Sequence, residues 1–280
     1  MESTLCAHEI GEGVPIVIIH GWEMNGKVEE LDFEPIFDSS KEDFRRIYVD
    51  LPGMGATTAN GLRDLDDMLV RLTGFIDGRL APSSRFMLVG SSCGAYLARA
   101  LAHQYAGRVD GLLLRVPLVE PQDGLRDLDP FRPLVADEGL MSSISDQDKA
   151  LLGNVLVQTP SYMKCLKSKY EYGYCPAMKA ADNEVLDPIR ADPSRYKISL
   201  ALDDDKVVMA APTLIVSGRQ DMTVGYRDSL RLLELYPRST FVVLDRGGHD
   251  LPVEQDGVFQ ALVRDWLTRV TEWRGSMGHP

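Results

Sequence analysis

The chain has 280 residues, of which 44% are hydrophobic, enough to bury the core of one large domain or two small ones. Its formal net charge is −12 and no stretch concentrates lysine and arginine, so we expect no nucleic-acid partner and no acidic membrane surface. The longest apolar runs, such as residues 14–19, are much shorter than a bilayer span.

The N-terminal residues and the cysteines indicate the compartment. Residues 1–13 contain neither a basic region nor an apolar run, so we expect no secretory signal. The four cysteines show neither CxxC pairs nor the spacing of metal ligands; they are Cys6, Cys93, Cys165 and Cys175. We therefore expect free thiols, no metal site and a cytoplasmic protein.

The first part of the chain alternates short apolar runs with helical patterns. Strands are predicted at residues 14–19, 44–50, 86–89 and 108–116, with an edge strand at 4–8. Helices are predicted at 62–80, directly after the strand at 86–89, and more weakly at 31–37. This alternation predicts an α/β fold with a mostly parallel central sheet flanked by helices.

After Pro117 the pattern changes. Residues 118–208 contain no strong strand pattern, and helices are predicted at 144–157 and 162–170. The alternation then returns, with strands at 212–218 and 240–244 and helices at 226–236 and 258–270, before a loose tail. We predict a helical cap at residues 118–208, inserted into a core formed by residues 1–117 and 209–280.

Tyrosine and methionine residues gather in the predicted cap, and they allow two interpretations. They could line an apolar pocket, or they could fill the cap's own core; they are Tyr162, Met163, Tyr170, Tyr172, Tyr174 and Met178. The acidic run Asp203 to Asp205 is interpreted as a solvated hinge rather than a metal site.

The pentapeptide Gly90-Ser91-Ser92-Cys93-Gly94 lies between a predicted strand and a helix that follows without a loop. So abrupt a turn forces its central residue into a strained conformation and requires small residues two positions away on each side. Gly90 and Gly94 meet that requirement around Ser92. This is the G-x-S-x-G nucleophile elbow, which exposes the serine hydroxyl at the C-terminal edge of the sheet.

Cys93 is the alternative nucleophile, because a helix N-terminus lowers the pKa of a thiol. Ser91 and Ala95 bracket Cys93, whereas two glycines bracket Ser92. We therefore favour Ser92.

A serine nucleophile needs a base and a group that orients the base. Of the five histidines, His249 follows the last predicted strand on a glycine-rich loop and is the best candidate; His279 lies in the tail. Asp221 follows the preceding strand and is the predicted orienting acid. Asp245, Asp250 and Glu120 are the alternative acids.

The order Ser92, Asp221, His249 resembles that of the α/β-hydrolase superfamily. The resemblance extends over residues 14–273 and includes the loop His20-Gly21-Trp22, the turn Asp50 to Gly55, the elbow, Gly218 to Asp221, and Gly248-His249.

The resemblance implies a role for each of these residues. Ser92 would attack a carbonyl carbon, His249 would take the proton, and Asp221 would hold the imidazole. The backbone N–H groups of Trp22 and Cys93 would form the oxyanion hole. His20 and Gly21 would shape the early loop, and no cofactor or metal would be required.

Three kinds of function remain open. The first is a capped serine hydrolase that acts on a small ester, lactone or thioester. The second is a carbon–carbon bond hydrolase or a lyase that uses the same three residues, although the loop at His20 lacks the residues typical of carbon–carbon hydrolases. The third is a ligand receptor with slow hydrolase activity. A serine at position 92 argues against haloalkane dehalogenases and epoxide hydrolases, whose elbows carry aspartate. The sequence gives no oligomeric state.

Overall fold

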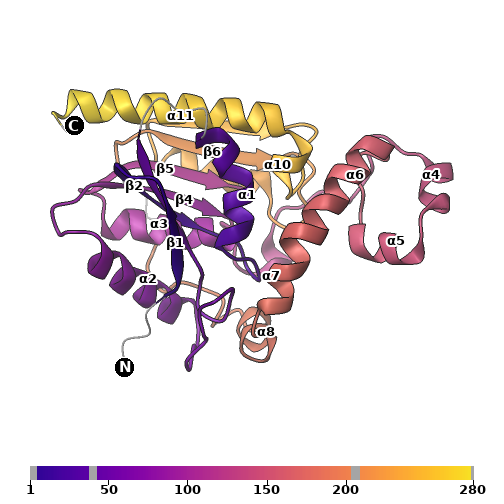
Figure 1. Ribbon diagram of the computed structural model, residues 1–280, viewed down its shortest axis with the longest axis horizontal. Helices are drawn as coiled ribbons and strands as arrows, with labels where there is room; N and C mark the ends of the chain where they lie inside the picture. Colours follow the sequence, from indigo (N-terminus) through magenta and orange to yellow (C-terminus); the bar gives the residue numbers. More distant parts are fainter. Residues whose placement is uncertain (1–4, 38–42, 203–208, 279–280) are drawn as a thin grey trace.

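The computed structural model describes residues 5–37, 43–202 and 209–278 (Figure 1). Seven strands form one sheet in the order β1-β3-β2-β4-β5-β6-β7. The strands are β1 (Ala7–Ile10), β2 (Val14–Ile19), β3 (Phe44–Val49), β4 (Phe86–Ser91), β5 (Val109–Arg115), β6 (Thr213–Gly218) and β7 (Ser239–Leu244). Only β1 among them pairs antiparallel, with β3, and the remaining pairs are parallel. The predicted fold class is confirmed.

The central strands are buried because helices cover both faces of the sheet. Every residue of β4, β5 and β6 is buried, as expected for nearly continuous apolar runs in a parallel sheet. Outside the segment between β5 and β6, the helices are α1 (Gly26–Phe37), α2 (Leu65–Arg79), α3 (Cys93–Gln104), α9 (Tyr226–Leu230), the 3₁₀ turn η3 (Arg231–Leu233), α10 (Leu251–Glu254) and α11 (Asp256–Ser276). α1 and α11 lie on one face of the sheet, and α2 and α3 on the other (Figure 1).

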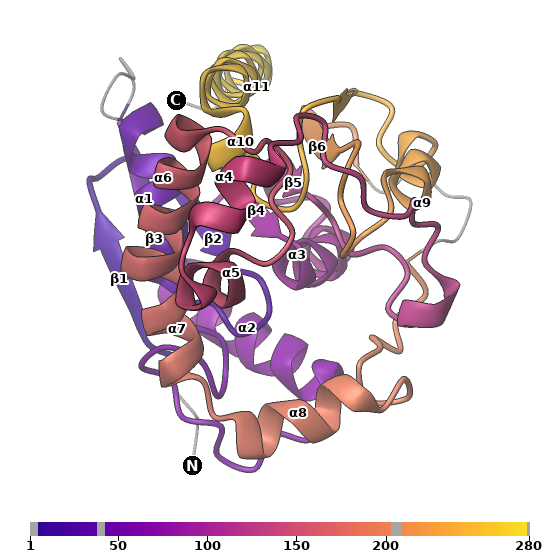
Figure 2. The ribbon, with the colours of Figure 1, turned by 90° about the vertical axis from the view of Figure 1, so that its right-hand side faces the viewer.

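The segment between β5 and β6 consists mainly of short helices, which we call the inserted helices. They are η1 (Asp123–Leu125), α4 (Glu138–Ser143), α5 (Asp146–Leu152), α6 (Pro160–Lys169), the π-turn η2 (Tyr170–Tyr174), α7 (Cys175–Ala180) and α8 (Asn183–Ala191). Figure 2 shows them in front of one end of the sheet. The division into a core and a cap at residues 118–208 stays a prediction.

The predicted tyrosine and methionine cluster divides into three groups. Tyr162 and Met163 pack into a small separate core of the inserted helices. Tyr170, Tyr174 and Met178 line a cavity, and Tyr172 is 74% exposed. Each of the two interpretations therefore holds for part of the cluster.

The single helix predicted at residues 144–157 is wrong. The helix there is α5, which begins after the N-cap Ser145 and ends at Gly153. Gly153 has φ +56°, a conformation that favours glycine and ends a helix, and Val157 forms an isolated bridge with Val135. The apolar residues beyond Gly153 continue the sequence pattern but belong to an irregular segment.

Other elements differ at their ends. The helix predicted at 226–236 changes to a 3₁₀ turn after Leu230, and α11 continues to Ser276, where a loose tail was predicted. The helices α4, α7, α8 and α10 were not predicted. Asp203 to Asp205, His279 and the start of the edge strand at Thr4 lie outside the described residues.

Two sequence-based expectations can be compared directly with the structure. All four cysteines are free, as predicted. No helix within the described ranges combines the length and the apolar character that crossing a bilayer requires.

Candidate active site

Ser92 lies between the last residue of β4 and the first residue of α3, with φ 54° and ψ −118°. This conformation is strained for a residue with a side chain, and the structure around it leaves no room for larger neighbours. A Cβ atom on Gly90 would lie 2.5 Å from the carbonyl oxygen of Gly94. A Cβ on Gly94 would lie 2.3 Å from the carbonyl oxygens of Ile19 and His20. The two glycines therefore let the turn form against the end of β2.

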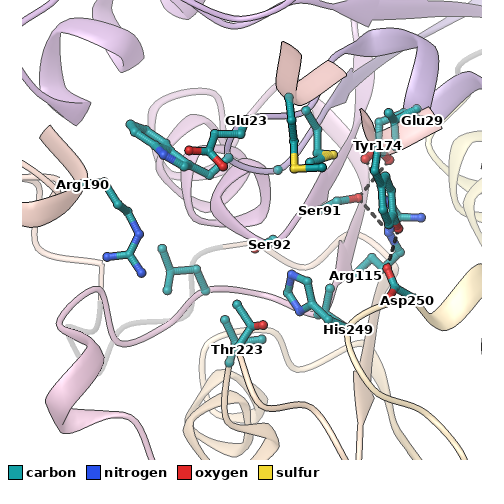
Figure 3. Close-up of a pocket in the computed structure, with 18 of the residues that line it drawn as sticks. Glu23, Glu29, Ser91, Ser92, Arg115, Tyr174, Arg190, Thr223, His249 and Asp250 are labelled. Carbon is teal, nitrogen blue, oxygen red and sulfur yellow. Dashed lines mark hydrogen bonds and ion pairs between the residues drawn. The ribbon is translucent and has the colours of Figure 1, made fainter. Parts of the chain in front are cut away.

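Ser92 and His249 line the same cavity, which we call the elbow pocket (Figure 3). Its volume is about 350 Å³, at the lower end of the range for small-molecule sites. The lining residues are Gly21, Trp22, Glu23, Met24, Val28, Glu29, Ser91, Ser92, Arg115, Val116, Leu118, Arg126, Tyr170, Tyr174, Met178, Arg190, Tyr196, Thr223, Val224, His249 and Asp250. The pocket thus lies between the strand ends and the inserted helices.

Backbone strain concentrates at the elbow pocket. Among the described residues, four that are not glycine have a positive φ: Glu23, Asn60, Ser92 and Val116. All of these except Asn60 line the pocket. Strained backbone persists only where the surrounding structure holds it, and such residues cluster at functional sites.

His249 is oriented by Asp221. Its Nδ1 lies 2.8 Å from Oδ2 of Asp221, whose other oxygen accepts the N–H groups of Thr223 and Val224 at 2.7 and 3.0 Å. The Asp221 side chain is 1% exposed and the His249 side chain 31%, so the imidazole reaches the pocket while the carboxylate does not. Burial alone would lower the pKa of His249, but the Asp221 carboxylate raises it above its usual value.

The loops after β6 and β7 meet through a close backbone contact. A Cβ on Gly218 would lie 2.2 Å from the carbonyl oxygen of Gly248. The N–H of Gln220 donates to the carbonyl of Gly247 at 2.8 Å. This contact brings Asp221 and His249 together although they follow different strands.

The alternative acids differ from Asp221 in position or in hydrogen-bond partner. Glu120 accepts the N–H of Gln122 and does not line the elbow pocket. Asp245 is exposed. Asp250 lines the pocket, and its carboxylate accepts the hydroxyl of Tyr174 at 2.6 Å. Asp221 is the carboxylate that contacts the imidazole of His249.

His20 is fully buried, and both of its ring nitrogens contact the backbone. Nε2 accepts the N–H of Leu51 at 3.0 Å, so Nδ1 carries the hydrogen and donates to the carbonyl of Gly21 at 2.7 Å. Burial lowers the pKa of His20 to about 4, which keeps the ring neutral. This arrangement fits the loop-shaping role that the sequence predicts.

Gly21 lies directly against the elbow. A Cβ on Gly21 would lie 3.3 Å from the Cβ of Ser92 and 3.5 Å from the carbonyl oxygen of Ser91. The loop after β2 therefore passes close to the Ser92 side chain at Gly21.

The Cys93 thiol is buried beneath the elbow. It is fully inaccessible to solvent, and burial raises its pKa to about 11, so it carries a proton at neutral pH. As the first residue of α3, Cys93 has a backbone N–H with no partner inside the helix. The Cys93 side chain is therefore buried as a protonated thiol, while its backbone N–H is a candidate oxyanion donor.

A buried polar network beside Ser92 was missed by sequence reasoning. Arg115 donates to the Ser91 hydroxyl at 2.9 Å, to Glu29 at 2.8 Å and to Asp32 at 2.6 Å. Ser91 in turn donates to Glu29 (Figure 3). Lys169 of α6 pairs with Asp32. The sequence feature that could have indicated this network is Arg115, an arginine at the end of an apolar strand.

The far end of the pocket also holds charges that were not predicted. Arg190 of α8 lies with its guanidinium 4.5 Å from the ring centre of Tyr196 and donates to Asp123. Burial raises the pKa of Glu23, which lines the same region. The pocket is therefore polar at both ends, with apolar residues such as Met24 and Val224 also in its lining.

Comparison with known proteins agrees with this geometry. The model of the α/β-hydrolase fold family matches residues 14–256. The chain belongs to the α/β-hydrolase fold family. The match spans the elbow and the loops that carry Asp221 and His249.

Relatives within this α/β-hydrolase family have more than one chemistry. The chain is 26% identical over 265 residues to a 2-hydroxy-6-oxo-2,4-heptadienoate hydrolase of Pseudomonas putida, covering 93% of this chain and 91% of the relative. It is 25% identical over 257 residues to a pimeloyl-[acyl-carrier protein] methyl ester esterase of Aliivibrio salmonicida, covering 89% and 90%. An α/β superfamily hydrolase of Oenococcus oeni PSU-1 has a similar structure, with a TM-score of 0.83, 24% identity and coverage of 96% and 97%.

Proposed function

We propose that this protein is a serine hydrolase that cleaves a small ester, lactone or thioester through an acyl-enzyme on Ser92. The observation that carries the proposal is the 2.8 Å contact between His249 and Asp221 beside a pocket that Ser92 also lines. Family membership and the esterase among the relatives support hydrolase activity.

The proposed mechanism begins with the proton of Ser92. With Nδ1 of His249 donating to Asp221, Nε2 is left to accept the proton as the Ser92 Oγ attacks the carbonyl carbon. The imidazolium then donates that proton to the leaving group, and the acyl-enzyme forms. A water molecule, activated by the same imidazole, attacks the acyl carbon and releases the acid.

The negative charge that develops on the substrate carbonyl oxygen would be stabilised by the backbone N–H groups of Trp22 and Cys93. Removing one donor of this kind typically lowers kcat by about 10² to 10³-fold. The free N–H at the start of α3 and the close packing of Gly21 on Ser92 support these positions. In this scheme His20 and Gly21 hold the loop, while Gly90 and Gly94 hold the elbow.

The inserted helices would act as a cap that limits the size of the substrate. Tyr170, Tyr174 and Met178 support this role because they line the same pocket as Ser92. A cavity of about 350 Å³ favours small substrates over long acyl chains. The proposed partner is therefore a small-molecule carbonyl compound, with no nucleic acid, no membrane, no cofactor and no metal.

A carbon–carbon bond hydrolase is the second candidate. The 26% identity to the 2-hydroxy-6-oxo-2,4-heptadienoate hydrolase, over 93% of this chain, favours it. The same nucleophile and base would serve, but the leaving group would be a carbon atom. The polar network around Arg115 would then lie close to the substrate.

Steady-state turnover with two substrates distinguishes the ester hydrolase from the carbon–carbon bond hydrolase. We expect repeated turnover of p-nitrophenyl butyrate, abolished in Ser92→Ala. Faster turnover of 2-hydroxy-6-oxo-2,4-heptadienoate, followed by its absorbance, would favour the second candidate. A single burst of p-nitrophenol without further turnover would indicate a receptor instead of an enzyme.

A further inference from the structure

The loop that carries His249 is held from the inserted helices at two points. On one side, the hydroxyl of Tyr174 donates to Asp250, the residue after His249, at 2.6 Å. On the other, the hydroxyl of Tyr162 donates to Glu254 at 3.1 Å, and the second oxygen of Glu254 accepts the N–H of Gly248, the residue before His249. Both neighbours of the histidine are thus connected to one helical segment.

The contact of Tyr162 with Glu254 is buried, and that of Tyr174 with Asp250 is partly buried. Tyr162 is 6% exposed and Glu254 is 7% exposed. Hydrogen bonds to carboxylates in such surroundings are stronger than exposed ones, and a buried carboxylate that loses its donor is left unsatisfied. The contacts are therefore able to fix the position of the loop.

The π-turn η2 explains how one helical segment supplies both tyrosines. In an uninterrupted α-helix, residues 162 and 174 would point about 120° apart around the axis. A π-turn accommodates one additional residue, which reduces the angle between the two side chains by about 100°. Tyr170–Tyr174 form such a turn between α6 and α7, so Tyr162 and Tyr174 face the His249 loop together.

We propose that Tyr162, Tyr174, Glu254 and Asp250 form a histidine clamp through which the inserted helices position His249 for catalysis. The inference rests on the proposed function, because it assigns the base to His249. In this arrangement the hydroxyls of Tyr162 and Tyr174 act through the histidine, while the ring of Tyr174 also lines the pocket. The inserted helices would then contribute to the rate as well as to the shape of the pocket.

Removal of single hydroxyl groups tests the histidine clamp. In Tyr162→Phe and Tyr174→Phe we expect kcat for p-nitrophenyl butyrate to fall about tenfold while KM changes less than about twofold. The matched control is Tyr172→Phe, on the same turn but 74% exposed, which should behave as wild type. Thermal unfolding of each variant separates a loss of rate from a loss of structure.

Hydrogen exchange provides a readout that does not depend on activity. The Gly248 N–H donates to Glu254, so we expect the peptide that contains Gly248 and His249 to exchange about tenfold faster in Tyr162→Phe than in the control. If exchange and kcat in both variants match those of Tyr172→Phe, the clamp is wrong. If the wild-type protein has no esterase activity, the proposed function fails, while the exchange comparison still decides whether the tyrosines hold the loop.

Discussion

At the scale of single residues, the proposed chemistry depends on the charge of Asp221 next to His249. The base must be neutral to accept a proton, and the Asp221 carboxylate raises the pKa of His249 above its usual value despite burial. In the wild-type protein, kcat/KM should therefore increase with pH through a pKa above that of a free histidine, about 6.5.

The variant Asp221→Asn tests this dependence. Loss of the carboxylate should move the acidic limb of the kcat/KM profile to lower pH, because the imidazolium loses its stabilising charge. It should also lower kcat by about 10⁴-fold, because an amide can hold the wrong tautomer. The control is Asp245→Asn, an exposed carboxylate after β7, whose profile should stay unchanged. An unchanged profile in Asp221→Asn would contradict the assigned role.

At the scale of elements, the turn at Ser92 forms only because no side chain lies between the start of α3 and the end of β2. A methyl group on Gly94 would lie 2.3 Å from two backbone oxygens, and neither oxygen can move without distorting β2. Gly74, in α2, has open space around the corresponding position.

Replacing these two glycines by alanine should have opposite effects. Gly94→Ala should lower the free energy of unfolding by more than about 4 kcal/mol or prevent folding. Gly74→Ala should raise it by about 0.5–1 kcal/mol, because alanine favours a helix over glycine. Urea denaturation measures the free energy of unfolding of both variants. A Gly94→Ala variant as stable as wild type would show that the elbow is less tightly packed than described.

Individual strands and helices differ in how well their sequence predicts them. Residues 14–19 and 86–89 were predictable as strands because their apolar runs end in turn residues, and the tight turn at Ser92 was predictable because glycines flank it. The helix predicted at 144–157 failed at Gly153, whose positive φ ends α5 although apolar residues continue beyond it. Periodicity cannot show which backbone conformation a glycine adopts.

At the scale of the whole molecule, one buried network joins the sheet, α1 and the inserted helices. Arg115 of β5 pairs with Glu29 and Asp32 of α1, and Asp32 also pairs with Lys169 of α6. These residues are far apart in the sequence, so no spacing or motif connects them. The positions of Ser92, Asp221 and His249 at one edge of the sheet were predictable because each residue follows a strand. The network was not predictable, because it depends on packing between elements.

Removal of the central cation should destabilise the fold. In Arg115→Met, the buried carboxylate of Glu29 loses its charged partner and Asp32 keeps only Lys169, so the free energy of unfolding should fall by about 3–5 kcal/mol. The control is Arg63→Met, whose ion pair with Asp67 lies at the surface with Arg63 75% exposed, and little change is expected. Equal stability of the two variants by urea denaturation would indicate that the network does not support the fold.

The central claim is that Ser92 is a nucleophile activated by His249. Labelling with a fluorophosphonate probe, followed by mass spectrometry of the peptide that contains Gly90 to Gly94, tests both parts at once. We predict a label on Ser92 in the wild-type protein and none in His249→Ala. A label on Cys93, or no label on this peptide in the wild-type protein, would contradict the account.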